Sequence, residues 1–331
     1  MKLCTYELNA GLGPVRRTGV VTEAGIVDAG AARAAFLETS LPAAAAARVG
    51  AAQCPPDMLE LIGAGQQVLD WLAEAVEFVT RHGRATTGAG MPVVHARAAV
   101  RLLAPVPRPP GIANFSVWPD HSANAATRGV HLTPAAAGAA VKTYWKGNPD
   151  STVGTDTVLR IPAYAPMVDV ECEFAAVVGT GGRDLDRAAA ERAIVGYTIL
   201  NDTSARDIQL IEMKSGRGPS KGKDFDTGNV QGPWIVTRDE MDPKAQTMAL
   251  VVNGAVLSSC ATSGMVWEFA EMLSYMSTSQ TIHPGQIISA GCYAGGSARE
   301  CDRVLKEGDV VEMRITGIGA LRSIIGGKDA A

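Results

Sequence analysis

The sequence predicts a two-part α+β protein, in which a small N-terminal domain precedes a β-rich barrel or roll. Three observations predict this class. The first hundred residues are rich in alanine and carry apolar residues at helical spacing, whereas the later residues form short β-like runs separated by glycine and proline. A proline-rich connector lies between these two kinds of sequence pattern. We therefore expect one domain over residues 1–105 and another over 106–331.

Two helices are expected in the first domain. One lies near residues 28–38, and a longer one spans 56–83, where apolar side chains recur at helical spacing and Gly83 provides a stop. The connector "LLAPVPRPPGIANF" follows, with prolines at 105, 107, 109 and 110. Each proline fixes φ and removes a backbone donor, so this segment joins two folding units.

The second domain is predicted from its many short β-like runs. They include "TVLRIP", "VECEFAAVVG", "VGYTILND", "GPWIVT", "MALVVNGAVL", "QIISAGC" and "DVVEMRITGIG". Valine, isoleucine and aromatic residues in these runs favour extended backbone. Short strands with turn signals between them are typical of a barrel or roll and not of a doubly wound sheet.

Composition and charge exclude several kinds of partner. A chain of 331 residues with 47% hydrophobic and 19% charged residues is ordinary for a folded soluble protein. The formal net charge of −4, without a clustered basic excess, argues against a nucleic-acid or anionic-membrane surface. No apolar stretch is long enough to span a membrane, and the first residues lack the apolar core of a signal peptide. The six cysteines show no zinc-like spacing, which indicates reduced thiols in a cytoplasmic protein.

Two glutamates interrupt one of the β-like runs, in "VDVECEFAAVVG". Side chains two apart on a strand point to the same face, so Glu171 and Glu173 lie together at about 6–7 Å spacing. Two carboxylates on one face repel each other and are costly to bury. Asp202 ends the run "AIVGYTILND" and completes a three-carboxylate cup if the two strands are neighbours. Hard divalent cations prefer such oxygen ligands.

The alternative for this acidic set is a solvent-exposed one. Glu171 and Glu173 would then face water from an edge strand, and Asp202 would cap a turn. In either case the alternation of the strand places Cys172 on the opposite face, where we expect it in the core.

One histidine follows the connector, in "ANFSVWPDHSANAATRG" (113–129). His121 lies in a loop-like stretch, after Trp118 and Pro119 and before the expected start of a helix. It is the candidate general base, because histidine changes its charge near neutral pH. A structural or exposed histidine is the alternative.

Together these segments resemble the fumarylacetoacetate hydrolase family. The resemblance rests on "VDVECEFAAVVG", "GYTILNDTSARDIQ", "GKDFDTGNVQGPW", "VNG" and "LKEGDVVEMRITGIGAL", in the family's order over about residues 110–325. The string Asn-Asp-x-Ser-Ala-Arg-Asp-x-Gln is highly specific. The resemblance implies a mixed β-roll over 106–331 after a small α+β domain, and a homodimer formed through the β-rich domain.

The resemblance also implies a site. It makes Glu171, Glu173 and Asp202 the ligands of a divalent ion, with Mg²⁺ first and Mn²⁺ or Ca²⁺ as alternatives. It makes His121 the catalytic histidine. Three further residues correspond to site positions of the family. Gln209 falls on a substrate-contacting glutamine, and Lys223 falls on the lysine of a Gly-Lys-x-Phe motif. Thr227 matches a position near the metal.

Three positions depart from the family's pattern. Asn114 stands where fumarylacetoacetases proper carry an aspartate that binds the metal, so the site loses one negative charge, although an asparagine carbonyl oxygen can still serve as a ligand. Asn124 stands where the shorter acylpyruvate-cleaving members carry a glutamate that orients water. Cys292 replaces an expected threonine that contacts substrate. These changes bear on the substrate and on the reaction.

We therefore expect a metal-dependent hydrolase that cleaves a carbon–carbon bond of a small 1,3-diketo acid of the acylpyruvate type, through an enolate. His121 would activate water, Gln209 would orient the small oxo-acid substrate, and Lys223 and Arg128 would hold a carboxylate or a developing oxyanion. The same site supports decarboxylation of a β-keto acid, hydration or isomerisation of an unsaturated 2-oxo acid, and dehydration of a sugar acid. A non-catalytic ligand-binding relative is the alternative of another class.

Overall fold

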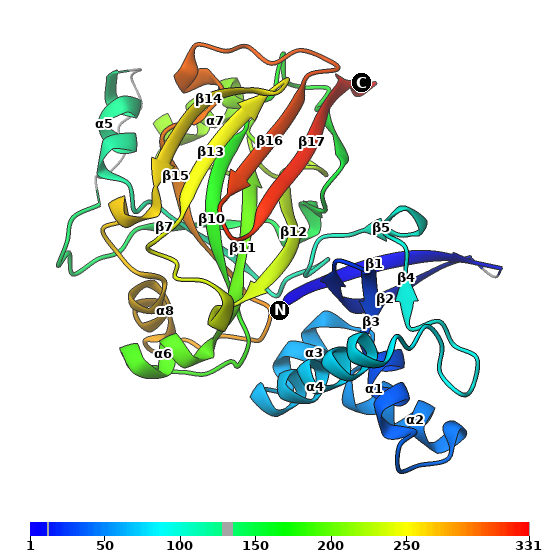
Figure 1. Ribbon diagram of the computed structural model, residues 1–331. Helices are drawn as coiled ribbons and strands as arrows, with labels where there is room; N and C mark the ends of the chain where they lie inside the picture. Colours follow the sequence, from blue (N-terminus) through cyan, green and yellow to red (C-terminus); the bar gives the residue numbers. More distant parts are fainter. Residues whose placement is uncertain (12, 128–134, 331) are drawn as a thin grey trace.

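The computed structural model describes residues 1–11, 13–127 and 135–330 (Figure 1). Its N-terminal strands are β1 (Lys2–Ala10), β2 (Gly13–Thr22), β3 (Gly25–Asp28), β4 (Val94–His95) and β5 (Arg101–Leu102). The helices of this part are α1 (Ala29–Leu37), α2 (Ala43–Gln53), α3 (Met58–Gly63) and α4 (Gln66–His82). Arg128, expected to bind substrate, lies outside the described residues.

The later part is mainly extended. Its strands are β6 (Ile112–Phe115), β7 (Tyr144–Gly147), β8 (Thr152–Val153), β9 (Thr157–Ile161), β10 (Glu171–Val178), β11 (Ile194–Asp202), β12 (Asn229–Thr237), β13 (Thr247–Val252), β14 (Ala255–Ala261), β15 (Ile287–Ser297), β16 (Val310–Ile315) and β17 (Gly319–Lys328). Its helices are α5 (Pro119–Thr127), α6 (Arg187–Ala193), α7 (Arg206–Lys214) and α8 (Phe269–Ser277). Short 3₁₀ turns lie at Arg97–Ala99, Pro149–Ser151, Arg238–Glu240, Thr262–Gly264 and Arg299–Cys301.

These strands form two mixed sheets, and the predicted α+β class with a mixed β-roll is confirmed. The large sheet runs in the order β4-β3-β2-β1-β12-β11-β10-β15-β6-β7, and the smaller one in the order β14-β13-β16-β17-β9. Most neighbours are antiparallel, but β15–β6, β12–β8 and β17–β9 are parallel pairs. Both sheets are open rather than closed into a barrel. Figure 1 shows β13, β16 and β17 lying over β10, β11 and β12.

The central strand β10 is buried on both faces. One face packs against the smaller sheet, where Cys172 and Phe174 join a core with residues such as Leu250 and Met313. The predicted inward position of Cys172 is confirmed. On the other face Ala175 and Val177 pack with apolar residues of α3 and α4, and the two glutamates continue this same face toward the start of the strand.

The N-terminal strands extend the large sheet. β1 pairs with β2 and also with β12, where Lys2 lies opposite Val236 and Leu3 opposite Ile235. Helices α3 and α4 then pack beside the sheet and share a hydrophobic cluster with β10, β11, β12 and β15. The boundary at residue 105 stays a prediction. Among the described residues, no helix is long and apolar enough to cross a membrane.

The long helix predicted over residues 56–83 is wrong in one respect, since two helices occupy this range. α3 ends at Gly63 and α4 begins at Gln66. Between them Gly65 has φ of 88°, which is outside the helical region and is readily adopted only by glycine. The apolar periodicity continues through the break, which is why the sequence predicts one helix. Gly83 follows the last residue of α4, as predicted.

Gly291 controls how closely β6 approaches β15. Its φ is 78°, and a Cβ at this position would lie 2.1 Å from the backbone oxygen of Phe115. An alanine in the left-handed region costs about 1–2 kcal/mol in strain. We expect Gly291→Ala to lower the free energy of unfolding by more than this, because β6 must also move away from the new Cβ. Gly254 is a matched control, since its φ is 80° and its added Cβ would meet nothing within 4 Å. Urea unfolding compares the two variants, and equal losses would contradict the close-approach argument.

Candidate active site

Three buried carboxylates form the centre of the site. β10 and β11 pair antiparallel with Cys172 opposite Asn201, which brings Asp202 beside the start of β10. Oxygen atoms of Glu171, Glu173 and Asp202 all lie within 4.8 Å of one another, and the three side chains are buried. We call this set the acidic cup. The proximity predicted from strand alternation is present, whereas the solvent-exposed alternative is wrong.

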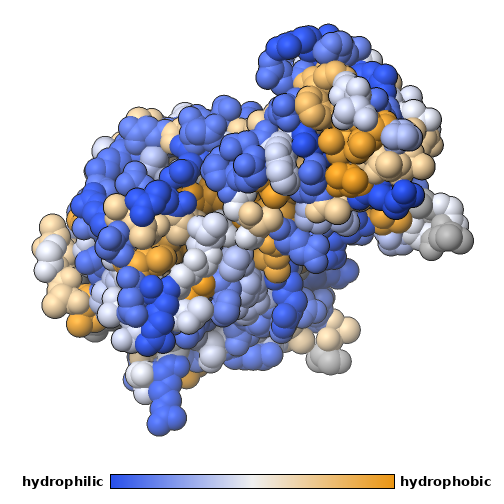
Figure 2. Space-filling model, turned by 90° about the horizontal axis from the view of Figure 1, so that it is seen from below, coloured by the Kyte–Doolittle hydropathy of each residue, from blue (hydrophilic) through white to orange (hydrophobic). Residues whose placement is uncertain are grey.

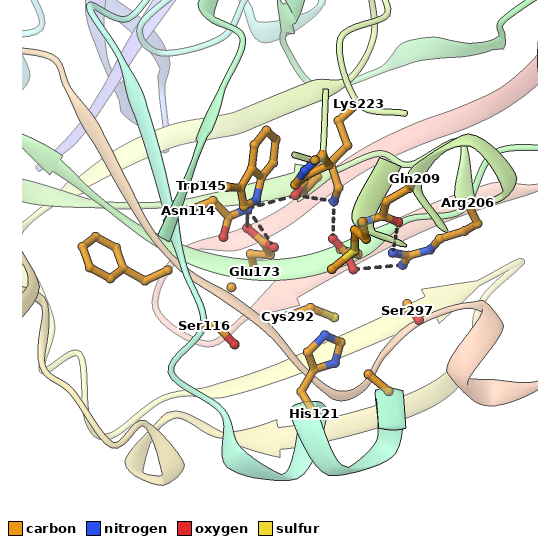
Figure 3. A pocket seen from close by; sticks show the side chains of 18 of the residues that line it. Asn114, Ser116, His121, Trp145, Glu173, Arg206, Gln209, Lys223, Cys292 and Ser297 are labelled. Atoms are coloured by element: carbon orange, nitrogen blue, oxygen red, sulfur yellow. Dashed lines mark hydrogen bonds and ion pairs between the residues drawn. The ribbon is translucent and has the colours of Figure 1, made fainter. Parts of the chain in front are cut away.

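Two cations balance part of the charge of the acidic cup (Figure 3). The Nζ atom of Lys223 lies 2.7 Å from Oε2 of Glu171 and 2.5 Å from Oδ2 of Asp202. The guanidinium of Arg206, on α7, lies 2.9 Å from Oε1 of Glu171 and 2.8 Å from Asp169. Because Lys223 is only 2% exposed, these interactions act with little screening by water.

The three carboxyl groups have different pKa shifts because the cations are unevenly placed. Burial favours a raised pKa for Glu171, but Arg206 and Lys223 outweigh it and hold the pKa below its usual range. Burial raises the pKa of Asp202 to about 7, against the opposing effect of Lys223. Burial, followed by the charges of Asp202 and Glu171, raises the pKa of Glu173 well above its usual range. Among the three carboxyl groups, Glu173 is therefore the one whose ionised form a further positive charge would stabilise most.

Neutral donors complete the support of the acidic cup. Asn114 Nδ2 donates to Glu173 at 2.9 and 3.1 Å and to Asp202 at 2.9 Å. The Ser289 hydroxyl donates to Glu173 at 2.6 Å. The Asn114 amide nitrogen thus faces the acidic cup. Acceptor-only carboxylates explain this orientation, since they need donors.

The residues present fit a divalent cation. When all are ionised, the three carboxylates outnumber the two cations that contact them, and one of these cations, Arg206, is shared with Asp169. Oδ1 of Asp202 is buried and has no hydrogen-bond partner within the described part of the chain. A buried oxygen without a partner is unfavourable unless a ligand completes it. All-oxygen donor sets of this kind suit Mg²⁺, Mn²⁺ or Ca²⁺.

His121 approaches the same cavity from the opposite side (Figure 3). It lies in the first turn of α5, so the loop-like position predicted for it is wrong, because the helix already begins at Pro119. A proline fits the first turn of a helix, since its missing N–H would have no partner there. The His121 side chain is 14% exposed, and its Nδ1 lies 3.1 Å from Oε1 of Glu300.

Glu300 is a site residue that the sequence reasoning missed. It belongs to the 3₁₀ turn Arg299–Cys301, which follows β15. A single glutamate after a strand carries no pattern of its own, and only the tertiary structure brings it to His121. Cys292 lies in the same group, with ligand atoms of the three residues within 4.8 Å of one another. Burial, together with the carboxylates around it, raises the pKa of Cys292 well above its usual range, so it stays a neutral thiol.

The other candidates are placed as follows. Gln209 lies on α7, where its Oε1 accepts a hydrogen bond of 2.9 Å from Arg206. Asn124 lies on α5 and is half-buried. Thr227, which lies four residues after Lys223 in the sequence, is buried. Arg206 was not singled out from the sequence, although it lies inside the most specific string of the chain.

These side chains line a cavity of about 350 Å³. Ligand pockets commonly have this size. Its polar part contains the acidic cup together with Lys223, Arg206, Gln209, His121 and Glu300. The remaining walls include aromatic and aliphatic side chains from β6, β7 and α7. A small molecule that carries both an oxygen-rich end and an apolar end therefore matches the cavity.

The chain belongs to the fumarylacetoacetate hydrolase family. The model of the C-terminal domain of fumarylacetoacetate hydrolase matches residues 115–325, which include the acidic cup, Lys223 and His121. The resemblance predicted from the sequence motifs is confirmed.

Relatives agree with this assignment. A putative hydrolase of Burkholderia ambifaria is 36% identical over 172 residues, which are 51% of this chain and 60% of that protein. The crystal structure of maleylpyruvate hydrolase from Sphingobium sp. SYK-6, with manganese(II) and pyruvate, aligns with a TM-score of 0.67 at 22% identity over 99% of this chain and 100% of that one. A 5-carboxymethyl-2-hydroxymuconate delta-isomerase from Mycobacterium smegmatis aligns with a TM-score of 0.64 at 23% identity over 99% and 100%. At these identities the two structures show the shared fold.

Proposed function

We propose that this protein is a divalent-metal-dependent hydrolase that cleaves the carbon–carbon bond of a small acylpyruvate-type 1,3-diketo acid. The observation that carries the proposal is the pairing, across one cavity, of an oxygen-only acidic cup with His121 and its carboxylate neighbour Glu300. The first element holds a cation for an oxo-acid end, and the second can activate water.

The acidic cup would hold the ion through Glu171, Glu173 and Asp202, and we propose Mg²⁺ as the native one. When bound, such an ion supplies Lewis-acid polarisation of the substrate and charge stabilisation for an enolate. Lys223 donates two of its three N–H groups to the acidic cup among the described residues, which leaves one for a substrate oxygen. Gln209 lines the cavity beside Arg206 and can orient the substrate.

His121 is the proposed general base. Oε1 of Glu300 lies 3.1 Å from Nδ1 but outside hydrogen-bond geometry. A small rotation of the imidazole would let an Nδ1–H group donate to Glu300, which would leave Nε2 to accept a proton from water. The hydroxide formed attacks the acyl carbonyl. The bond between this carbonyl carbon and the methylene carbon then breaks, and its electron pair passes to the methylene carbon of the pyruvate enolate. The proton returns from His121 to that carbon, which gives a carboxylic acid and pyruvate.

An enolate-forming site also supports proton transfer without hydrolysis. The same base can isomerise an unsaturated 2-oxo acid or assist hydration, and enolate stabilisation can serve decarboxylation of a β-keto acid. These remain the alternative reactions. A non-catalytic binding protein is a weaker alternative, because both the acidic cup and the His121–Glu300 pair line the same cavity.

Loss of the ultraviolet absorbance of enolised acetylpyruvate tests the proposal. We expect turnover with Mg²⁺ or Mn²⁺, no turnover after chelation, and recovery when the metal is restored, because the acidic cup has to polarise the oxo acid. A pyruvate assay on the products checks that the carbon–carbon bond was cleaved. Turnover that persists in chelator would contradict the metal requirement. Absence of turnover with metal bound would direct the search to oxaloacetate decarboxylation and unsaturated sugar acids.

We also propose a cytoplasmic homodimer formed through the β-rich part. β14 lies at one edge of the smaller sheet and exposes Val256 to solvent, which supports a contact between copies at this edge. Light scattering measures the mass in solution, and a monomer at micromolar concentration would contradict the dimer.

A further inference from the structure

The cavity is lined by two kinds of side chain, and the apolar kind has no role in the proposed reaction. It comprises Phe115, Tyr144 and Trp145, from β6 and β7, and Leu210 and Met213, from α7. Trp145 also lies beside the charged groups, since its ring centre is 5.3 Å from Nζ of Lys223. The rings of Phe115 and Tyr144 lie 4.7 Å apart. We call these five residues the apolar wall. The tail of acetylpyruvate beyond its acyl carbonyl is a single methyl group, which can contact only part of the apolar wall.

Helix α7 contributes apolar side chains that the core does not use. None of its residues is buried, and Leu210 and Met213 remain half-exposed beside the cavity. Neither belongs to a hydrophobic cluster of the described core, although α7 contains three large apolar residues in its second half. Apolar surface left in contact with water is a source of binding free energy for a ligand that covers it.

The charges of the lining limit the number of carboxylates that a ligand can bring. Four acidic groups line the cavity, namely Glu171, Glu173, Asp202 and Glu300, and three basic ones, Lys223, Arg206 and Arg299. The described lining therefore carries −4 + 3 = −1, with neutral histidine. A divalent ion changes this to +1, which one substrate carboxylate neutralises. Within the described lining no further net positive charge then remains, so burying a second carboxylate on the tail is unfavourable there.

From these observations we infer that the substrate is a monocarboxylic acylpyruvate whose acyl tail is apolar, either a longer alkyl chain or an aryl group, and that Leu210 and Met213 determine this specificity. The inference rests on the proposed function for the reaction, but its binding part concerns any 2-oxo acid held by the acidic cup. The carboxylate and the two oxo groups lie at the polar part, and the tail lies against the apolar wall.

A substrate series tests the inference with the metal-loaded protein. Acetyl-, butanoyl-, hexanoyl- and benzoylpyruvate differ only in the tail, and fumarylpyruvate carries a second carboxylate. We expect kcat/KM to rise by about fourfold for each methylene that the apolar wall covers, until the cavity is filled. We expect fumarylpyruvate to lie about tenfold or more below benzoylpyruvate, because the described lining offers no net positive charge to its second carboxylate. A flat series, or a preference for fumarylpyruvate, would overturn the inference while leaving the hydrolase proposal standing.

Variants on α7 separate specificity from folding. Leu210→Ala and Met213→Ala should each lower the ratio of kcat/KM for hexanoylpyruvate over acetylpyruvate by about tenfold, because the contact with one or two methylenes of the tail is lost. The control is Ile211→Ala, on the same helix, since Ile211 is 67% exposed and does not line the cavity. It should leave the ratio unchanged. An effect of Ile211→Ala as large as that of the other two would assign the change to the helix as a whole and contradict the inference.

A binding measurement covers the case in which no acylpyruvate is hydrolysed. Calorimetry with Mn²⁺ compares phenylpyruvate, which has one carboxylate and an aryl tail, with 2-oxoglutarate, which has two carboxylates. Tighter binding of phenylpyruvate, weakened by Leu210→Ala, would support the apolar tail even where the hydrolase proposal fails. Tighter binding of 2-oxoglutarate, or equal binding of both, would overturn the inference whatever the reaction is.

Discussion

His121→Ala is expected to lower kcat for acylpyruvate hydrolysis by about 10²–10⁴-fold, the usual contribution of a positioned general base. The affinity for the metal ion should stay near that of the unchanged protein, because His121 faces the acidic cup across the cavity and makes no described contact with its carboxylates. Stopped-flow or steady-state absorbance measures kcat, and Mn²⁺ calorimetry measures the metal affinity. The matched control is His82→Ala, an exposed histidine at the end of α4, which should leave both unchanged.

Glu300→Gln tests whether the base is positioned by its neighbour. We expect a smaller fall in kcat than in His121→Ala, with KM little changed, because the imidazole stays in place but loses the carboxylate that favours a proton on Nδ1. A merely structural role for Glu300 would leave kcat unchanged in the folded variant. Full activity in His121→Ala would remove the general-base assignment altogether.

Glu173→Gln and Lys223→Met should have opposite effects on the stability of the metal-free protein. Glu173 has no direct cation contact among the described residues and lies beside two other carboxylates, so Gln in its place removes repulsion. We expect the free energy of unfolding in chelator to stay the same or rise. Binding of Mn²⁺ and turnover should both be lost, because one of three oxygen ligands is replaced by a neutral one.

Lys223→Met removes the cation that bridges Glu171 and Asp202 and leaves buried negative charge uncompensated. Breaking a buried ion pair from one side typically costs about 3–5 kcal/mol, and we expect a loss of this order in urea unfolding. A Mn²⁺ titration of Glu173→Gln separates the effect on metal binding from the effect on stability, since this variant should be folded but unable to bind Mn²⁺. The prediction fails if Glu173→Gln binds Mn²⁺ normally or if Lys223→Met is as stable as the unchanged protein.

Much of the fold could be predicted because it follows local patterns. Periodicity over a few residues is enough to predict three of its features. These are the helix end at Gly83, the strand at Glu171–Val178 and the inward position of Cys172. The break at Gly65 was missed because the apolar period continues on both sides of it, and one positive φ ends the helix without changing the pattern. The sequence predicts a loop at His121 because the expected helix start comes after this residue, whereas α5 already begins at Pro119.

The sequence by itself determined that Glu171 and Glu173 share a face, that Asp202 ends a strand, and that the motifs belong to the fumarylacetoacetate hydrolase family. Alternation along a strand is a local property, so it needs no knowledge of the rest of the chain. Only the tertiary structure decided the groups that complete the site. Lys223 bridges the acidic cup, Asn114 turns its amide nitrogen toward it, and Glu300 meets His121. These contacts join segments that are distant in sequence, and they depend on how β6, β10, β11 and β15 pair, which no local period specifies.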